Sequence, residues 1–166
     1  LQWYKEKKIQ YITFGGYAGT GKTTLLGYLG QHLHKENKKI KIAYCSYTGK
    51  AARVLQHKLR DAKAIHSSDY VGTIHGLIYK AIVDDRDNIV GWEKKLQEEF
   101  PYTLIIVDEA SMVTKQIWDD LLSFNVPILA TGDHGQLPPV EGSFNLMLNP
   151  TLKLEEIFRQ ERDNPI

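Results

Sequence analysis

Short apolar runs of strand length alternate along this chain with longer segments in which apolar residues recur every three to four positions. The short runs are rich in Ile, Val, Thr and aromatic residues, which favour strands, and the longer segments have the period of an amphipathic helix. The pattern predicts strands over residues 9–14, 40–46, 103–107 and 126–130. It predicts helices over residues 23–33, 49–59 and 115–122, with Thr114 as the cap of the last.

The run at 103–107, Thr-Leu-Ile-Ile-Val, is apolar throughout. Continuous apolar strands are typical of sheets that are covered on both faces, and such sheets are mostly parallel. Strands that alternate with helices therefore predict an α/β fold with a mostly parallel sheet. In folds of this kind, ligands bind at the carboxyl ends of the strands.

Residues 78–97 do not fit this alternation. An acidic cluster, Asp-Asp-Arg-Asp-Asn, separates two short β-rich pieces in this stretch. Turn residues between two such pieces predict a hairpin-like excursion from the sheet.

Composition narrows the class of protein. The chain has 166 residues, 42% hydrophobic and 25% charged, which is typical of one globular domain and excludes disorder. Its formal net charge is +1, so any contact with a nucleic acid must be local. Cys45 is the single cysteine, and no Cys/His cluster has metal-ligand spacing. Without a secretory signal or an apolar run long enough to span a membrane, a cytoplasmic protein is expected.

Residues 16–23 match the phosphate-loop pattern G-x-x-x-x-G-K-[ST]. Glycines let backbone N–H groups turn towards a phosphate, Lys22 is expected to reach the β- and γ-phosphates, and Thr23 to coordinate Mg²⁺. The helix predicted after the loop would present its positive N-terminus to the same anion. The predicted nucleotide-binding set is Gly16, Tyr17, Ala18, Gly19, Thr20, Gly21, Lys22, Thr23 and Thr24.

Two carboxylates, Asp108 and Glu109, directly follow the apolar run at 103–107. They are expected at the carboxyl end of a strand, where the phosphate loop of a neighbouring strand also emerges. Asp108 would bind Mg²⁺, and Glu109 would position and deprotonate the water that attacks the γ-phosphate. This pair favours hydrolysis of the nucleotide.

A polar loop follows the strand predicted at 126–130, and it contains Gln136, Pro138 and Pro139. The neutral Gln136 side chain is suited to hydrogen-bond the γ-phosphate or the attacking water. The two prolines stiffen the segment beyond it and would relay the nucleotide state to whatever binds nearby. On the residues alone, an ordinary turn explains this loop equally well.

These motifs together resemble the helicases of superfamily 1, most closely the RecD/Dda-like branch. Residues 16–24, 47–52, 72–77, 107–113, 132–140 and 154–160 resemble motifs I, Ia, Ib, II, III and IV in that order. The resemblance implies a P-loop NTPase fold, with a RecA-like parallel sheet flanked by helices. It also implies one RecA-like ATPase domain (1A) over residues 1–166, with a small inserted 1B element at about 78–97 that serves the family as a strand-separating pin.

The resemblance assigns further site residues. Arg159 in motif IV would stabilise charge on the γ-phosphate. A single-stranded DNA track is implied at Thr48, Lys50, Thr73, His75, Pro138 and Pro139. Lys50 as a solvated lysine and His75 as a packed loop histidine remain alternatives. In the 1B element, Trp92 or Tyr79 would serve as a wedge, although core packing is the preferred interpretation for both.

The function that the resemblance implies is an ATP-dependent DNA helicase or translocase that uses ATP and Mg²⁺ and moves 5′ to 3′ on single-stranded DNA. A second RecA-like domain of the full-length protein would close the ATP site, so this chain alone is expected to bind nucleotide weakly and to unwind nothing. The alternatives are a nucleotide-dependent switch without translocation and a nucleotide-binding scaffold without turnover. The residues do not choose between replication, repair and recombination.

Overall fold

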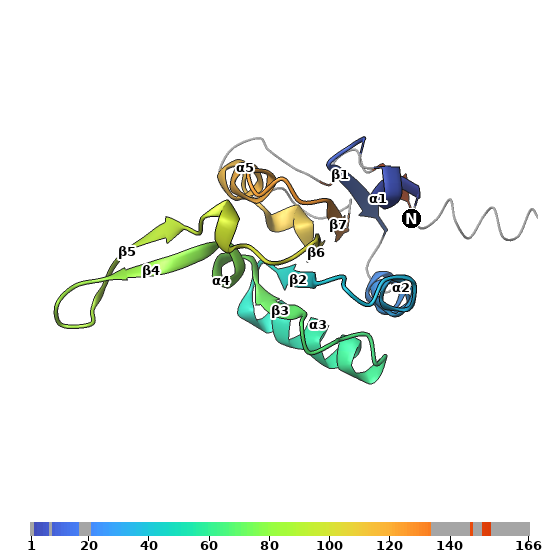
Figure 1. The fold of residues 1–166 in the computed structure, drawn as a ribbon, viewed down its shortest axis with the longest axis horizontal. Helices are drawn as coiled ribbons and strands as arrows, with labels where there is room; N and C mark the ends of the chain where they lie inside the picture. The colour runs from blue at the N-terminus through green and yellow to red at the C-terminus, as the bar shows by residue number, and fades with distance from the viewer. Residues whose placement is uncertain (1, 7, 17–20, 134–146, 148–150, 154–166) are drawn as a thin grey trace, which may run out of the picture.

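A six-stranded sheet forms the centre of the molecule, and every pairing between its strands is parallel (Figure 1). The computed structural model describes residues 2–6, 8–16, 21–133, 147 and 151–153. The strand order is β3-β2-β6-β7-β1-β8. The strands are β1 (Tyr11–Gly15), β2 (Ile42–Ser46), β3 (Tyr70–Thr73), β6 (Leu104–Asp108), β7 (Ile128–Gly132) and β8 (Leu152–Lys153).

Helices cover both faces of this sheet (Figure 1). The helices α2 (Lys22–Glu36) and α3 (Gly49–Asp61) lie on one face, and α4 (Ile74–Ile78) and α5 (Lys115–Leu122) lie on the other. The remaining helical segments are α1 (Gln2–Glu6), η1 (Gln97–Glu99) and η2 (Ala110–Met112), of which the last two are 3₁₀ turns.

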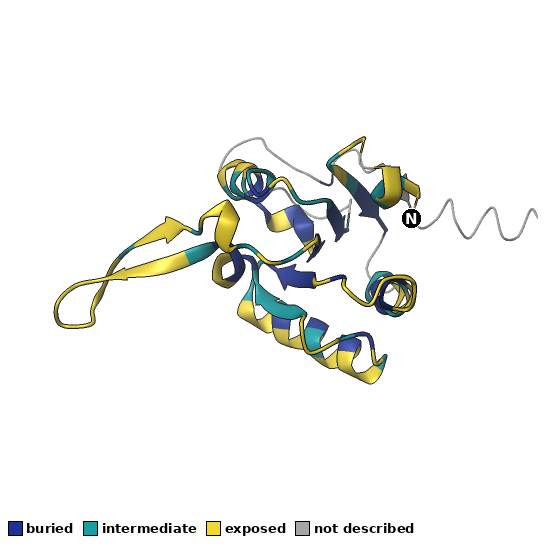
Figure 2. Ribbon diagram, viewed as in Figure 1, coloured by how far each residue is buried: buried dark blue, intermediate teal, exposed yellow. Residues whose placement is uncertain are grey.

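The strands β2, β6 and β7 each contribute to two hydrophobic cores, one on each face, because successive side chains of a strand point to opposite sides. In β2, Ile42 and Tyr44 belong to the core beneath α2 and α3, whereas Ala43 and Cys45 belong to the core beneath α4 and α5. All five residues of β2, β6 and β7 are buried, which Figure 2 shows as dark strands between paler helices. Burial on both faces explains why these strands are apolar without alternation.

A two-stranded antiparallel hairpin, β4 (Tyr79–Val83) and β5 (Ile89–Lys94), projects from the body of the molecule and is exposed over most of its length (Figures 1 and 2). Two of its hydrogen bonds to the rest of the fold are made at its base. The Tyr79 hydroxyl donates a hydrogen bond to the Asp120 carboxylate, and Lys94 Nζ donates to Ser123 Oγ across 2.6 Å. The hairpin is therefore attached to α5 at its base, where β4 begins and β5 ends.

The structure confirms the α/β order, the parallel sheet and the hairpin excursion. The predicted strands and helices are all present, with bounds shifted by a few residues, and Thr114 caps α5 by accepting a hydrogen bond from the Ile117 N–H. The short elements β3, α4, β8, η1 and η2 were not predicted. In the part of the chain that the structure describes, no helix is long and apolar enough to cross a membrane.

Candidate nucleotide-binding site

The ends of the phosphate loop are fixed to the sheet and to α2. At its start, the Gly16 N–H donates a hydrogen bond to the Gly132 carbonyl at the end of β7, across 3.2 Å. At its other end, Gly21 caps α2 with a left-handed backbone (φ 84°), and its carbonyl accepts from the Leu25 N–H at 3.0 Å. A side chain at position 21 would be strained in this conformation, so glycine is needed there for the chain to enter the helix.

Lys22 lies in the first turn of α2 with its ammonium group at the start of the loop. Its Nζ donates a hydrogen bond to the Gly16 carbonyl across 2.6 Å. Burial lowers the pKa of Lys22 below its usual value, and the carboxylates of Asp133, Asp108 and Glu109 oppose this shift. The ammonium group is thus held between the loop and the acids that surround the site.

Asp108 ends β6 and is held by a set of hydrogen bonds, with only 8% of the residue exposed. Its Oδ1 accepts from Thr131 Oγ1 at 2.9 Å and from the Glu109 N–H at 3.0 Å. Its Oδ2 lies 3.5 Å from Thr23 Oγ1. Ser46 Oγ donates to the Asp108 backbone carbonyl at 3.2 Å. The carboxylate is oriented by the Thr131 hydroxyl of β7 and by the backbone N–H that follows β6, and it faces the first turn of α2.

The pair Thr23 and Asp108 fits a magnesium ion. Mg²⁺ prefers oxygen ligands and is usually held by one or two protein groups, with phosphate oxygens and water completing its shell. A hydroxyl and a carboxylate that lie 3.5 Å apart beside a phosphate loop supply such a donor set. Among the described residues, no group of three or more His, Cys, Asp or Glu side chains forms a metal cage. The ion would therefore depend on the nucleotide for its remaining ligands.

Glu109 follows Asp108 but lies in a different environment. It is exposed, and its backbone is left-handed (φ 54°) at the point where β6 passes into η2. A glutamate in this conformation is uncommon and costs free energy, which is typical of functional sites. The turn separates the two neighbouring carboxylates into a buried one and a solvent-accessible one.

The strand β7 lies between β1 and β6, which corrects one expectation from the sequence. The phosphate loop and the acid pair come from strands that are not neighbours, because β7 pairs with both. Residues at the end of β7 consequently contact both parts of the site. Thr131 bonds to Asp108, and Gly132 bonds to Gly16. Sequence reasoning gave no individual role to Thr131 or Asp133, although both belong to the polar loop predicted after the strand at 126–130, and Asp133 lies within the segment 132–140 that resembles motif III.

Several predicted site residues lie outside the described residues. These are Tyr17, Ala18, Gly19, Thr20, Gln136, Pro138, Pro139 and Arg159. The structure therefore brings together Gly16, Gly21, Lys22, Thr23, Asp108 and Glu109. Thr24, the last member of the predicted set, lies exposed in the first turn of α2.

Four of the residues predicted to contact DNA are described by the structure, and they lie at or just beyond the carboxyl ends of β2 and β3. The Thr48 hydroxyl caps α3 by accepting from the Ala51 N–H at 3.1 Å, and the Thr73 hydroxyl caps α4 by accepting from the Gly76 N–H at 3.1 Å. Both threonines thus have a structural role. Lys50, in the first turn of α3, is exposed.

His75 joins this edge of the sheet to the hairpin. Its ring lies 4.7 Å from that of Tyr79 and 4.5 Å from that of Trp92, centroid to centroid. Trp92 is 50% exposed, so the expectation that it packs in the core was wrong. The reason is that β5 is exposed over most of its length and the His75 ring meets the indole edge-on, at 80°. Tyr79, in contrast, is partly buried against the core beneath α4 and α5.

The parallel sheet, the phosphate-loop sequence between β1 and α2, and the buried strand β6 that ends in Asp108 define this protein as a P-loop NTPase. The chain belongs to the AAA domain family, which matches residues 5–166. Its fold is similar to that in the crystal structure of the Pif1 helicase from Candida albicans, with a TM-score of 0.53 and 20% identity over 87% of this chain and 36% of that one.

Two curated relatives match nearly the whole chain. The ATP-dependent RecD2 DNA helicase of Deinococcus radiodurans is 32% identical over 162 residues, which are 93% of this chain and 20% of that protein. The ATP-dependent DNA helicase dda of Enterobacteria phage T4 is 29% identical over 164 residues, which are 95% of this chain and 34% of that protein. These relatives confirm the resemblance to the RecD/Dda-like branch of superfamily 1. The chain spans about a fifth and a third of their lengths.

Proposed function

We propose that this chain is the first motor domain, 1A, of an ATP-dependent DNA helicase, and that the hairpin β4–β5 is its inserted 1B element. The observation that carries the proposal is the Asp108 carboxylate, which is fixed by Thr131 and the Glu109 N–H and lies 3.5 Å from Thr23. A nucleotide-binding scaffold has no need for a carboxylate oriented in this way beside a second, exposed acid.

In this function, the residues at the strand ends divide the work of ATP hydrolysis. Lys22 and the loop N–H groups bind the β- and γ-phosphates, and Thr23 and Asp108 hold Mg²⁺, which withdraws charge from the phosphate oxygens. Glu109 is exposed beside them and accepts the proton of the attacking water. Gln136 and Arg159 complete the proposed set, as sensor and charge stabiliser.

The proposed DNA track follows the carboxyl edge of β2 and β3. Ser46 and Thr73 are register partners on these strands, so the caps of α3 and α4 lie close together. Lys50 is exposed in the same region, and His75 lies next to the base of the hairpin. Contacts to phosphates and stacking without base reading suit sequence-independent binding of single-stranded DNA. Travel from 5′ to 3′ belongs to this proposal, as does a second RecA-like domain that closes the ATP site.

The test is ATP turnover by the full-length protein with and without single-stranded DNA, together with unwinding of a forked duplex. A helicase shows turnover that DNA stimulates and that Lys22→Ala abolishes. The matched control, Lys8→Ala, removes an exposed lysine outside the site and should leave both activities unchanged. Stable ATP binding without DNA stimulation would instead indicate the nucleotide-dependent switch, and would refute the motor.

A further inference from the structure

Two adjoining hollows lie at the amino edge of the sheet, at the opposite end of α2 from the nucleotide site. Their volumes are about 530 and 500 Å³. At a rise of about 1.5 Å per helical residue, Lys35 in the last turn of α2 is roughly 20 Å from Lys22 in its first turn. The first hollow is lined by Gln31, His34, Lys35, Lys38, Lys63 and His66. The second shares Lys63 and His66 and adds Gln56, Arg60, Ile65 and Ser67.

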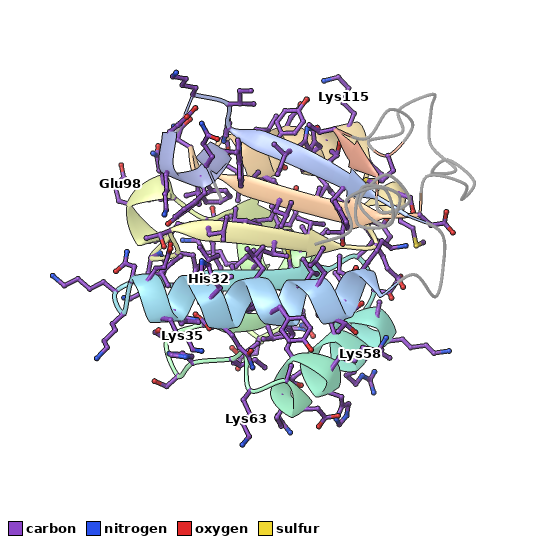
Figure 3. All side chains as sticks on the ribbon, turned by 90° about the vertical axis from the view of Figure 1, so that its right-hand side faces the viewer. His32, Lys35, Lys58, Lys63, Glu98 and Lys115 are labelled. Carbon is purple, nitrogen blue, oxygen red and sulfur yellow. The ribbon has the colours of Figure 1, made fainter. Side chains whose placement is uncertain are left out.

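The two hollows form a continuous basic groove, because Lys63 and His66 border both of them. Four permanently cationic side chains line it, and none of the described residues that line either hollow is acidic. The whole chain has a formal net charge of only +1, so this concentration of positive charge is local. Figure 3 shows Lys35 and Lys63 in the lower part of the view, with Lys115 at the top.

The floor of the groove is a rigid polar cluster. The side chains of His34 and Asp69 are 2% and 0% exposed, and His34 Nε2 lies 2.7 Å from Asp69 Oδ2. Asp69 also accepts hydrogen bonds from the N–H groups of Ile42 and His66, both at 2.9 Å. A buried carboxylate with three hydrogen bonds is well satisfied, so it fixes the segment that carries His66 against the end of α2.

His66 presents an exposed aromatic ring in this groove. Its ring stacks on that of His34 with centroids 3.6 Å apart and planes within 4° of parallel, and the residue is exposed. The second ring nitrogen of His34, Nδ1, is buried and has no hydrogen-bond partner in the described part of the chain.

We infer that this groove binds a second stretch of nucleic acid, with backbone phosphates on Lys35, Lys63 and Arg60 and a base stacked on His66. A chain of phosphates suits two joined hollows better than a single small anion does, and cations beside an exposed ring are the features that bind single strands without sequence preference. The inference goes beyond the proposed function, because the groove lies at the opposite edge of the sheet from the proposed DNA track.

The test is photocrosslinking of the full-length protein to an oligothymidylate that carries 4-thiothymidine, with the crosslinked peptide mapped by mass spectrometry. Crosslinks are expected within residues 63–67, in addition to any at the proposed track. Lys35→Glu/Lys63→Glu should lower the crosslinking yield at this peptide about tenfold. The remaining binding should also depend less on salt, since each lost phosphate contact reduces the slope of log affinity against log salt concentration by roughly 0.7 for a single strand.

The matched control is Lys39→Glu/Lys58→Glu, which makes the same change in net charge with two exposed lysines that line neither hollow. It should leave the yield at residues 63–67 within about twofold of the unmodified protein, because long-range charge is screened. Equal losses in the two double variants would overturn the inference, as would an absence of crosslinks at residues 63–67. Inorganic tripolyphosphate, added at equal phosphate concentration, should compete less well than unlabelled oligothymidylate. Equal competition would reduce the groove to a simple anion site.

Discussion

The Thr131 hydroxyl donates a hydrogen bond to Asp108 Oδ1 across 2.9 Å and so links the end of β7 to the acid that ends β6. Thr131→Val keeps the shape of the side chain but removes this donor. Because groups that orient a metal-binding carboxylate contribute about 10- to 100-fold to metal affinity, the Mg²⁺ concentration that supports half-maximal ATP turnover should rise by about that factor.

The control for this prediction is Thr131→Ser, which retains the hydroxyl and should stay close to the unmodified protein. A magnesium titration of ATP turnover by the full-length protein measures both variants. If Thr131→Val and the unmodified protein respond equally to Mg²⁺, Thr131 does not orient Asp108 for the metal.

Glu109 is the exposed acid of the pair, and Glu109→Gln tests its proposed role as general base. The change keeps the size of the side chain but removes the group that accepts the proton. ATP turnover should fall by about 10²- to 10⁴-fold, the usual contribution of a general base, while the affinity for a nucleotide changes little. Single-turnover hydrolysis and equilibrium nucleotide binding separate the two effects. Turnover that survives the substitution would assign the base to another residue.

Gly30 in α2 packs against the buried hydroxyl of Tyr44, and this contact allows a test by two substitutions. A Cβ at position 30 would collide with Tyr44 Oη, whereas the ring carbon Cζ would lie 3.3 Å away. Gly30→Ala alone should therefore destabilise the fold, at about 1–3 kcal/mol for an overpacked site. Tyr44→Phe removes the hydroxyl but keeps Cζ at 3.3 Å. The cost of Gly30→Ala should therefore be smaller in this background, where the helical preference for alanine over glycine, about 1 kcal/mol, opposes what remains of it.

Tyr44→Phe by itself is expected to be neutral or stabilising. Its hydroxyl is buried and has no hydrogen-bond partner among the residues that the structure describes, so removing it removes a desolvation cost. Denaturant unfolding of the four proteins in this cycle gives the coupling free energy. Additive effects of the two substitutions would show that Gly30 and Tyr44 do not meet as described.

The sequence predicted those parts of the fold that local patterns decide. The inner strands were recognised because burial on both faces makes them continuously apolar.

The strand β3 was missed because its residues are half-buried, it spans only Tyr70–Thr73, and it contains a glycine. The position of β7 between β1 and β6 depends on pairing between distant segments, which the order of the chain does not reveal. For the same reason the sequence predicted Asp108 but not its partner Thr131, 23 residues away. It also gave no sign that His34 and Asp69 would meet.

Thr48 combines a structural role with a proposed role in the DNA track, and two substitutions separate them. Thr48→Ala removes the cap of α3 and should cost about 1 kcal/mol of stability. Thr48→Asp retains a cap and favours the positive end of the helix, so stability should be kept. Its negative charge would nevertheless repel DNA phosphates, and the affinity for single-stranded DNA should fall. Thermal unfolding and fluorescence anisotropy measure the two properties. Unchanged DNA affinity in Thr48→Asp would place the track elsewhere.

The hairpin is fixed to α5 by the bonds from Tyr79 to Asp120 and from Lys94 to Ser123. If the hairpin separates strands, its orientation relative to the ATPase core must be maintained while the core steps along DNA. Tyr79→Phe and Lys94→Met each remove one bond and retain most of the apolar side chain. A hydrogen bond contributes about 1 kcal/mol net, roughly a fivefold change in the population that is correctly attached. Both variants of the full-length protein should therefore unwind a forked duplex several-fold more slowly, with little change in ATP turnover stimulated by single-stranded DNA.

Lys80→Met is the matched control for this attachment. Lys80 pairs with Glu93 of the hairpin itself and with Glu99 of η1, at 3.5 and 3.8 Å, and neither of these partners belongs to α5. Since both partners are well exposed, such pairs contribute little, and unwinding by this variant should be unchanged. Parallel losses of unwinding and ATP turnover in Tyr79→Phe would mean that the bond to Asp120 stabilises the core instead of orienting the hairpin. A selective loss of unwinding would show that α5 orients the hairpin relative to the site of ATP hydrolysis. The helix α5 is suited to this role because it follows soon after the acid pair and η2.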